Sequence, residues 1–216
     1  MKSSSVDIIY HKIVEYILQG EIKPGEKIVQ LDFAKKLGAS ITPVREALRR
    51  LQSDGLITVE PQRGATLKKL SIEEVEEIYS IRVKLEGLAV ELTINNLDDA
   101  KIENLVEFRR KFRSSLEHKD NLRWLNDNTD FHSYFAEFCK NATLCQMIRN
   151  LYIKVNKYKY VALMHPNWIT EYSLQHEEII NAAIDKNSKD AGKLMEIHLD
   201  TVKENLMGYL KSFPFY

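Results

Sequence analysis

The sequence of 216 residues is poor in glycine and proline, with 8 and 5 residues respectively. An all-β fold with many tight turns would need more of both, so the composition favours a mainly helical protein. Only two cysteines are present, Cys139 and Cys145, which excludes a small disulfide-stapled protein and suits a reducing compartment. No apolar run approaches the ~18 residues of a membrane span, and the N-terminal segment lacks the unbroken apolar core of a signal peptide. We therefore expect a cytoplasmic protein with no membrane partner.

The sequence has no net charge, since 31 Lys and Arg residues balance 31 Asp and Glu residues. The charges are unevenly divided, however. Residues 1–70 contain 12 basic and 8 acidic residues, which leaves 19 basic and 23 acidic residues for 71–216. A basic first third joined to an acidic remainder is typical of a chain in which only the first part meets a polyanion. This small difference does not establish nucleic-acid binding on its own.

Residues 1–70 show the pattern of three short helices and a β-hairpin. The helices are predicted over residues 8–18, 31–37 and 43–53, with Asp7 and Thr42 as N-caps of the first and third. A short extended piece precedes the second helix, and two β-prone pieces at 56–59 and 65–67 follow the third. Helix, helix, tight turn, helix and hairpin together predict a winged helix-turn-helix domain over residues 1–70.

From Ser71 onward the pattern changes to long helices with no strand signal. The capping box Ser71-Ile-Glu-Glu74 opens a helix that continues to about Ile94. Five more helices are predicted, over residues 98–117, 121–140, 143–164, 168–186 and 188–211. We therefore predict a mainly α fold, in which the winged helix-turn-helix is followed by an antiparallel bundle of about six helices over residues 71–216.

The second helix of a helix-turn-helix lies in the major groove, with its first turn facing the base edges. Short hydroxyl side chains there suit phosphate contacts, while Arg45 can donate two hydrogen bonds to a guanine. An arginine followed by glycine at the hairpin tip can enter the adjoining minor groove. The alternative is an ordinary solvated helix face, with Glu46 paired to Arg50 at i, i+4. The candidate DNA-binding residues are Ser40, Thr42, Arg45, Arg49, Arg63 and Gly64.

These motifs resemble a known family. The resemblance rests on the run Leu37-Gly-Ala-Ser-Ile-Thr-Pro-Val-Arg-Glu-Ala-Leu48, on Leu51, on Asp54-Gly55-Leu56 and on Arg63-Gly64-Ala65. Together they closely resemble the winged-helix domain of GntR-type bacterial transcription regulators. The helical remainder resembles the FCD effector domain of the FadR-like branch, and the helix count favours its six-helix VanR-like subgroup. One departure is Ile41, where the family commonly has an arginine that contacts DNA.

Three of the six histidines have a spacing that suits a metal site. Asn128 and His132 are four residues apart and share a helix face, while His176 and His198 lie on two later helices. One amide oxygen and three imidazoles would suit zinc, nickel or manganese, with coordination positions left open. From spacing alone, each histidine is more often an ordinary core or surface residue.

The resemblance favours the metal site. Metal-binding FCD domains carry Asp or Asn four residues before the histidine of a Phe-His pair, then two histidines separated by 22 positions, and this sequence matches all four positions. The resemblance therefore implies that Asn128, His132, His176 and His198 bind a divalent ion. Because asparagine replaces the charged aspartate, an anion should be favoured at the open positions.

Arg82 also matches a basic position of the family, on the first helix of the bundle. It could bind an effector carboxylate through two parallel hydrogen bonds, or it could form an intrahelical pair with Glu86. These two alternatives are equally well supported by the sequence.

We interpret the chain as a transcription regulator, a repressor rather than an activator, that acts as a homodimer on double-stranded operator DNA. Its helical domain would sense a small organic acid through the bound metal. One alternative is a metal-dependent enzyme, which would leave the winged helix unexplained and lacks an acid or base at identifiable spacing. Another alternative is a sensor of the metal itself.

Overall fold

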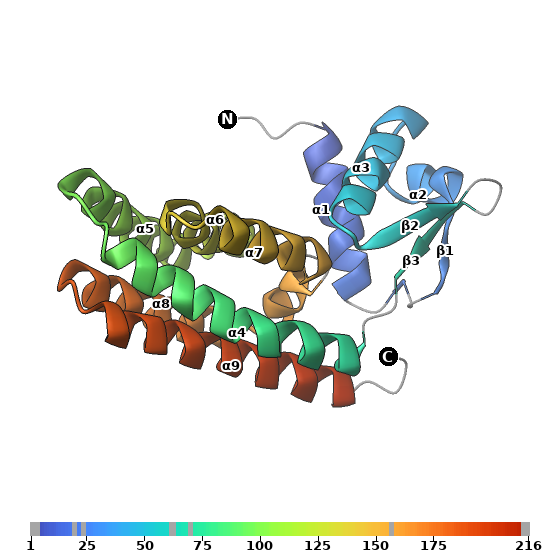
Figure 1. Cartoon of the computed structure of the whole chain (residues 1–216). Helices are drawn as coiled ribbons and strands as arrows, with labels where there is room; N and C mark the ends of the chain where they lie inside the picture. The colour runs from blue at the N-terminus through green and yellow to red at the C-terminus, as the bar shows by residue number, and fades with distance from the viewer. Residues whose placement is uncertain are drawn as a thin grey trace.

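A small N-terminal domain with a β-sheet lies at one end of an elongated helical bundle in the computed structural model (Figure 1). The structure describes residues 5–18, 21–22, 25–60, 64–68, 71–155 and 158–212. The predicted fold class, a winged helix-turn-helix followed by an all-α bundle, is confirmed. Among the described helices, none has the length and apolar character that crossing a membrane requires.

Three helices and a three-stranded antiparallel sheet make up the N-terminal domain. The helices are α1 (Ser5–Leu18), α2 (Gln30–Lys36) and α3 (Ile41–Ser53), and the strands are β1 (Lys27–Ile28), β2 (Ile57–Glu60) and β3 (Gly64–Leu67). The strand order is β1-β3-β2, with Ile57 opposite Leu67. Ile13 of α1 and both Val44 and Leu51 of α3 are fully buried with Ile57. This core holds one face of α3 and leaves the opposite face exposed.

Two helix starts in this domain differ from the prediction. Thr42 is not an N-cap, because Ser40 occupies the N-cap position with an extended backbone and α3 begins at Ile41. Pro43 is therefore the third helical residue, which is tolerated because amide groups in the first turn have no partner within the helix. Asp7 is also not an N-cap, since it lies inside the first turn of α1.

The bundle consists, in the described part of the chain, of long helices connected by short turns. These are α4 (Ile72–Ile94), α5 (Asp99–Glu117), α6 (Asn121–Phe138), α7 (Ala142–Val155), the 3₁₀ helix η1 (Lys159–Met164), α8 (Pro166–Ile184) and α9 (Ser188–Ser212). Predicted breaks are confirmed at Lys119, Lys140 and Lys186, whose backbones adopt the left-handed conformation with φ of 53°, 55° and 57°. The predicted capping box is half formed, because the Ser71 hydroxyl accepts the Glu74 N–H while the Glu74 carboxylate accepts a bond from elsewhere.

The helix predicted over residues 143–164 is wrong in its second half. α7 ends at Val155, and a separate 3₁₀ helix begins at Lys159. Tyr158 and Tyr160 are both buried, and their hydroxyls bind residues on different elements. These tertiary contacts outweigh the local helical pattern, because a short 3₁₀ turn directs neighbouring side chains differently from a continuous α-helix.

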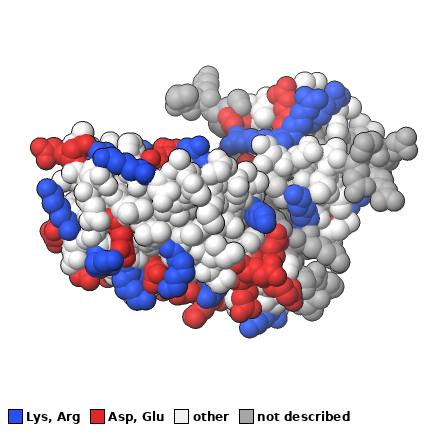
Figure 2. All heavy atoms as spheres, in the orientation of Figure 1, with Lys and Arg blue, Asp and Glu red and all other residues white. Residues whose placement is uncertain are grey.

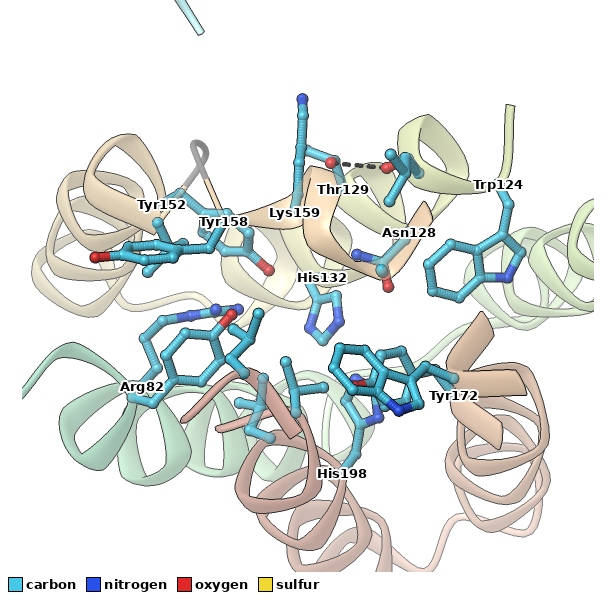
Figure 3. A pocket seen from close by; sticks show the side chains of 18 residues that line it. Arg82, Trp124, Asn128, Thr129, His132, Tyr152, Tyr158, Lys159, Tyr172 and His198 are labelled. Atoms are coloured by element: carbon cyan, nitrogen blue, oxygen red, sulfur yellow. Dashed lines mark hydrogen bonds between the residues drawn. The ribbon is translucent and has the colours of Figure 1, made fainter. Parts of the chain in front are cut away.

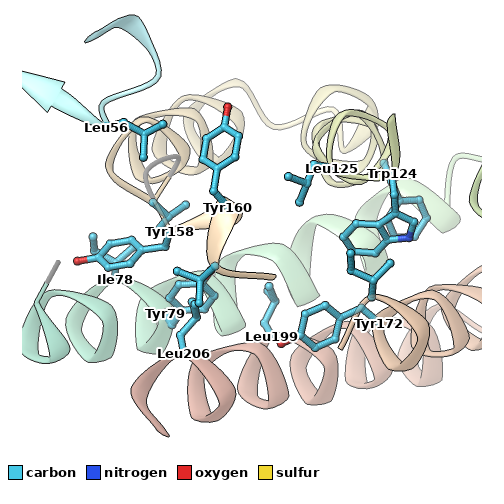
Figure 4. Packing of buried hydrophobic residues seen from close by; sticks show 14 of the residues in the cluster. Leu56, Ile78, Tyr79, Trp124, Leu125, Tyr158, Tyr160, Tyr172, Leu199 and Leu206 are labelled. Atoms are coloured by element: carbon cyan, nitrogen blue, oxygen red, sulfur yellow. The ribbon is translucent and has the colours of Figure 1, made fainter. Parts of the chain in front are cut away.

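The first and last helices of the bundle, α4 and α9, lie side by side along its length (Figure 1). Two glycines, Gly87 of α4 and Gly192 of α9, face each other across this contact. A Cβ added to Gly192 would lie 3.0 Å from the carbonyl oxygen of Gly87 and 2.6 Å from Glu91 Cγ. Figure 4 shows Tyr79, Tyr172 and other apolar side chains from several helices gathered beside α4 and α9. Polar residues of the candidate site are enclosed within this core.

Candidate functional site

The exposed face of α3 carries most of the predicted DNA contacts. Ser40, Thr42, Arg45 and Arg49 are all exposed, and the two arginines are one helical turn apart. Gly64 begins β3 with φ of 86°, a left-handed conformation that favours glycine, whereas Arg63 lies outside the described residues. The arrangement is compatible with entry of α3 into a major groove, and the individual DNA contacts stay predictions.

Arg50 lies on a different side of α3. Its Nη1 is 2.9 Å from Asp7 Oδ1, and its guanidinium lies 4.1 Å from the centre of the Tyr10 ring. The partner considered from the sequence was Glu46, but Arg50 pairs with Asp7 instead. Arg50 therefore ties α3 to α1.

Helices α6, α8 and α9 bring three histidines together inside the bundle. His132, His176 and His198 are 3%, 0% and 1% exposed, and one ring nitrogen of each lies within 4.8 Å of those of the others. The Nε2 atoms of His176 and His198 are 3.1 Å apart. A single divalent ion with bonds of ~2.0–2.1 Å to imidazole nitrogen fits such a separation. The structure thus places three of the four predicted ligands around one point.

Hydrogen bonds orient two of these rings. His132 Nδ1–H donates to Glu86 Oε2 over 2.8 Å, and His198 Nδ1–H donates to Gln175 Oε1 over 2.8 Å. Because both oxygens are acceptors, each Nδ1 carries the proton and each Nε2 keeps a lone pair. Both lone pairs are therefore available to a metal.

His176 gives a test of whether the residues fit an ion. Because His198 Nδ1 carries its proton, His198 Nε2 accepts the His176 Nε2–H over 3.1 Å, and His176 Nδ1 is left buried without a hydrogen-bond partner among the described residues. Burial, followed by the neighbouring imidazoles, holds the pKa of His176 and of His198 well below the ordinary value, so both rings are neutral at pH 7. Moving the His176 proton to Nδ1 would free its Nε2 lone pair beside that of His198 Nε2, and two such lone pairs repel each other unless a cation lies between them. A divalent ion relieves this repulsion, so the residues fit a metal.

Glu86 is the main residue of this site that sequence reasoning missed. It is 2% exposed, its Oε1 lies 2.7 Å from Arg82 Nε, and its Oε2 also accepts a bond from the Tyr152 hydroxyl. Burial opposes ionisation, but Arg82 and His132 outweigh it and hold the pKa of Glu86 at about 2. The pair with Arg82 could be seen from their i, i+4 spacing. No sequence signal indicated that the same carboxylate supports His132.

A cavity opens beside the histidines (Figure 3). The space that the centre of a water molecule can reach is about 70 Å³, room for several waters, since one needs ~10–15 Å³. Arg82, Asn128, His132 and His198 all line it, while His176 lies among the rings of aromatic residues. The cavity could therefore admit a small molecule that reaches both an ion and Arg82.

Arg82 is held between two aromatic rings. Its guanidinium lies 4.7 Å from the ring centres of both Tyr79 and Tyr152, and the residue is only 4% exposed. The intrahelical pair with Glu86 is present, and it uses Nε. The terminal nitrogens are not part of that bond, so the pair is compatible with recognition of an anion. Asn128 points into the same cavity (Figure 3), and its bond to an ion stays a prediction.

Two known protein families match the two parts of this chain. Residues 6–67 match the model described as bacterial regulatory proteins of the gntR family, and residues 77–201 match the FCD domain. The chain belongs to the GntR family. Its FCD domain places it in the FadR-like branch, so the predicted class, a GntR-type transcription regulator, is confirmed. A GntR winged helix-turn-helix domain implies DNA binding, and an FCD domain implies a small-molecule effector. FCD domains often bind metal.

Several relatives span nearly the same length as this GntR regulator. The uncharacterized HTH-type transcriptional regulator YdhC of Bacillus subtilis (strain 168) is 28% identical over 206 residues, covering 94% of this chain and 91% of the relative. The HTH-type transcriptional regulator McbR of Escherichia coli (strain K12) is 31% identical over 174 residues, or 79% and 78% of the two chains. The HTH-type transcriptional repressor RspR of the same organism is 25% identical, covering 92% and 87%.

A solved structure extends the comparison to the fold. The structure of E. coli McbR/YncC matches 98% of this chain and 100% of its own, with a TM-score of 0.66 and 25% identity. The winged helix and the bundle therefore occur together in a solved relative.

Proposed function

We propose that this GntR regulator is a dimeric, metabolite-responsive repressor that binds operator DNA through α3 and senses a small carboxylate through a divalent ion in the FCD bundle. The observation that carries the proposal is the cavity that His132 and His198 share with Arg82 (Figure 3). An ion held by the histidines would bind one end of an acid as a Lewis acid, and the guanidinium would bind a second oxygen. The repressor assignment is supported by the similarity to RspR, an HTH-type transcriptional repressor.

The charges of the site favour an anionic ligand. Three neutral imidazoles and an amide would leave the charge of a divalent ion uncompensated. The buried carboxylate of Glu86 shares its charge between His132 and the Arg82 guanidinium. A bound carboxylate would therefore complete both the coordination and the charge balance. The aromatic walls and the small volume restrict this ligand to an acid with few heavy atoms.

Dimer formation is supported by an apolar stripe on the outer face of α4. Ile81 and Leu88 are 48% and 44% exposed, and Leu85 and Leu92 lie partly buried beside them. Their 4-3-4 spacing is that of a helix packing seam. Figure 2 shows a broad uncharged surface over the middle of the bundle, with charged side chains towards its margins. A second copy seated there would carry two DNA-binding domains, which suits half-sites about 34 Å apart.

The proposal is tested by screening small organic acids for thermal stabilisation of the zinc-loaded protein. A ligand at 100 times its Kd should add about 2.7 kcal/mol to the free energy of unfolding. The stabilisation should require zinc, and it should be lost in His198→Ala and in Arg82→Ala. An acid that stabilises the protein equally without zinc would contradict metal-mediated sensing.

Binding to DNA is tested by retardation of fragments from the region around the gene. Arg45→Ala should abolish specific retardation, because Arg45 is a long donor near the start of α3, whereas Arg110→Ala on α5 should leave it unchanged. The acid with zinc should release the fragment. If zinc alone releases the fragment as fully as zinc with the acid, the metal is the signal.

A further inference from the structure

The cavity and the DNA-binding domain are separated by one short segment, residues 158–162. Tyr158, Lys159 and Ala162 line the cavity. Tyr160, which follows Lys159, is 5% exposed and points away from Tyr79 and Leu206 of the bundle core (Figure 4). One face of the segment is therefore a wall of the ligand site, and the other faces the winged helix.

Tyr160 bonds to the winged helix through its hydroxyl. The hydroxyl donates to Asp54 Oδ2 over 3.2 Å and also meets the hydroxyl of Tyr10, which itself donates to Asp54. Asp54 is the C-cap residue of α3, and Tyr10, from α1, is 1% exposed. Two phenols and one carboxylate thus join η1 to the end of the helix that is expected to enter the DNA groove.

Tyr158 bonds to the start of the bundle. Its hydroxyl accepts the Ser71 N–H over 3.1 Å and donates to Glu74 Oε2 over 2.7 Å. Ser71 is the N-cap of α4, and it follows the sheet of the winged helix in the chain. The same short segment therefore holds both the end of α3 and the point where the chain enters the bundle.

Helix α4 also connects the winged helix to the cavity, but it is poorly suited to independent movement. Its Gly87 lies against Gly192 of α9, so closely that an added Cβ would have no space. Helices packed at this distance move together, because a shift of one requires the other to follow. Moving the 3₁₀ helix η1 requires fewer contacts to break, because a few hydroxyl hydrogen bonds hold it to the winged helix and to the start of α4.

We propose that residues 158–162 transmit occupation of the cavity to the DNA-recognition helix, through the hydrogen bonds of Tyr160 to Asp54 and Tyr10. A ligand that displaces Lys159 or Ala162 also displaces Tyr160, and with it the end of α3. The hydroxyl bonds are either made or broken, which gives the discrete states that such coupling requires. This inference rests on the proposed function for the identity of the natural ligand, but not for the existence of the connection.

The first test uses zinc alone as the probe. Amide hydrogen exchange of the full chain is compared with and without zinc, in wild type and in Tyr160→Phe. In wild type, zinc should change exchange at the C-terminal end of α3 by about two- to tenfold, the effect of one net hydrogen bond on a local opening equilibrium. In Tyr160→Phe, the change at the histidine helices should persist while that at α3 disappears. Tyr134→Phe removes a hydroxyl bond to Lys101 within the bundle and should behave as wild type.

The second test needs no ligand, so it decides the inference even if zinc does not bind. Ala162→Val adds two methyl groups to the η1 wall of the cavity, and Val202→Leu adds one to the α9 wall. Only Ala162→Val should change exchange at the end of α3, and Ala162→Val with Tyr160→Phe should not add to the effect of Tyr160→Phe. An equal effect of both wall variants on α3, or an additive double variant, would overturn the inference. Absence of a zinc effect anywhere in wild type would overturn the metal part of the proposed function alone, whereas a zinc effect at the histidine helices with none at the end of α3 would overturn the inference.

Discussion

The histidines that meet in the bundle are supported by partners of different charge. His132 donates to the carboxylate of Glu86, whereas His198 donates to the amide oxygen of Gln175. A charged acceptor makes the ring a stronger electron donor to a metal. Glu86 is thus a positioning residue for the metal, although it is separated from His132 by 46 positions.

Glu86→Gln should weaken zinc binding by about 10–100-fold, because the amide removes the negative charge behind His132. Competition with a chromophoric chelator measures the affinity. Glu91→Gln, which removes a surface pair with Lys189, provides the matched control. Equal affinities of Glu86→Gln and wild type would show that the carboxylate does not support the site.

Asn128→Asp should strengthen zinc binding, because a carboxylate supplies a negative charge that the asparagine lacks. The same chelator competition measures the zinc affinity of this variant. Elemental analysis tests the histidines separately, and it should show loss of the ion in His132→Ala, in His176→Ala and in His198→Ala. Weaker binding in Asn128→Asp would indicate that position 128 does not contact the metal.

The sequence could predict the residue types of this site, but not its connections. The i, i+4 spacing placed Asn128 and His132 on one face, and family resemblance linked them to His176 and His198. The bond from Glu86 to His132 depends on how α4 packs against α6, which neither helix's own pattern contains. Arg50 shows the same limit, since its partner Asp7 lies 43 positions away.

At the scale of elements, the contact between α4 and α9 depends on two glycines. Gly192→Ala should lower the free energy of unfolding by about 1 kcal/mol, because crowding of ~1–3 kcal/mol outweighs the ~1 kcal/mol gain in helix propensity. A Cβ on Gly208, in the same helix, would meet no atom within 4 Å. Gly208→Ala should therefore raise stability by up to about 1 kcal/mol. Urea unfolding measures both, and a stabilising Gly192→Ala would contradict the close approach.

Helices with strong periodicity and clear breaks were predicted well, because their limits depend on neighbouring residues. The helix predicted over residues 188–211 agrees with α9 to within one residue. Lys119, Lys140 and Lys186, whose backbones are left-handed, lie at the predicted helix breaks. Prediction failed after Val155, where the bonds of Tyr158 and Tyr160 to Ser71 and Asp54 decide the conformation. Such long-range contacts are not encoded in local periodicity.

At the scale of the whole molecule, buried tyrosines should make the fold sensitive to alkali. Burial raises the pKa of Tyr10, Tyr158, Tyr160 and Tyr172 above the ordinary value of 10.0. Above about pH 10 the unfolded chain releases these protons while the folded chain retains them. The free energy of unfolding is therefore unaffected by these tyrosines below that pH and decreases as the pH rises above it. The loss should reach at most about 1.4 kcal/mol per pH unit for each tyrosine.

Urea unfolding from about pH 9 to pH 11 checks this prediction, because this range brackets the pKa of ~10 that tyrosine has in the unfolded chain. Tyr160→Phe should make the decline shallower, because one of the retained protons is removed. A free energy of unfolding that stays constant over this range would show that the hydroxyls ionise alike in both states.

The apolar stripe of α4 predicts the oligomeric state. Leu88→Glu should convert the proposed dimer to a monomer, because two carboxylates would face each other in a desolvated contact. Leu174→Glu on α8, where the leucine is 60% exposed, provides the control and should leave the dimer intact. Light scattering after size-exclusion chromatography measures the mass. A dimer that survives Leu88→Glu would place the interface elsewhere.

Because α4 packs along α9, the bundle cannot close until its last helix has been synthesised. The winged helix needs only the first third of the chain for most of its core, and domains made first generally fold first. At ribosomal rates of ~5–20 residues per second, α4 waits on the order of ten seconds for its partner. During that interval we expect the nascent chain to have a folded winged helix-turn-helix domain and an incompletely packed bundle. A newly made molecule would then be able to touch the chromosome before it is able to respond to the metabolite.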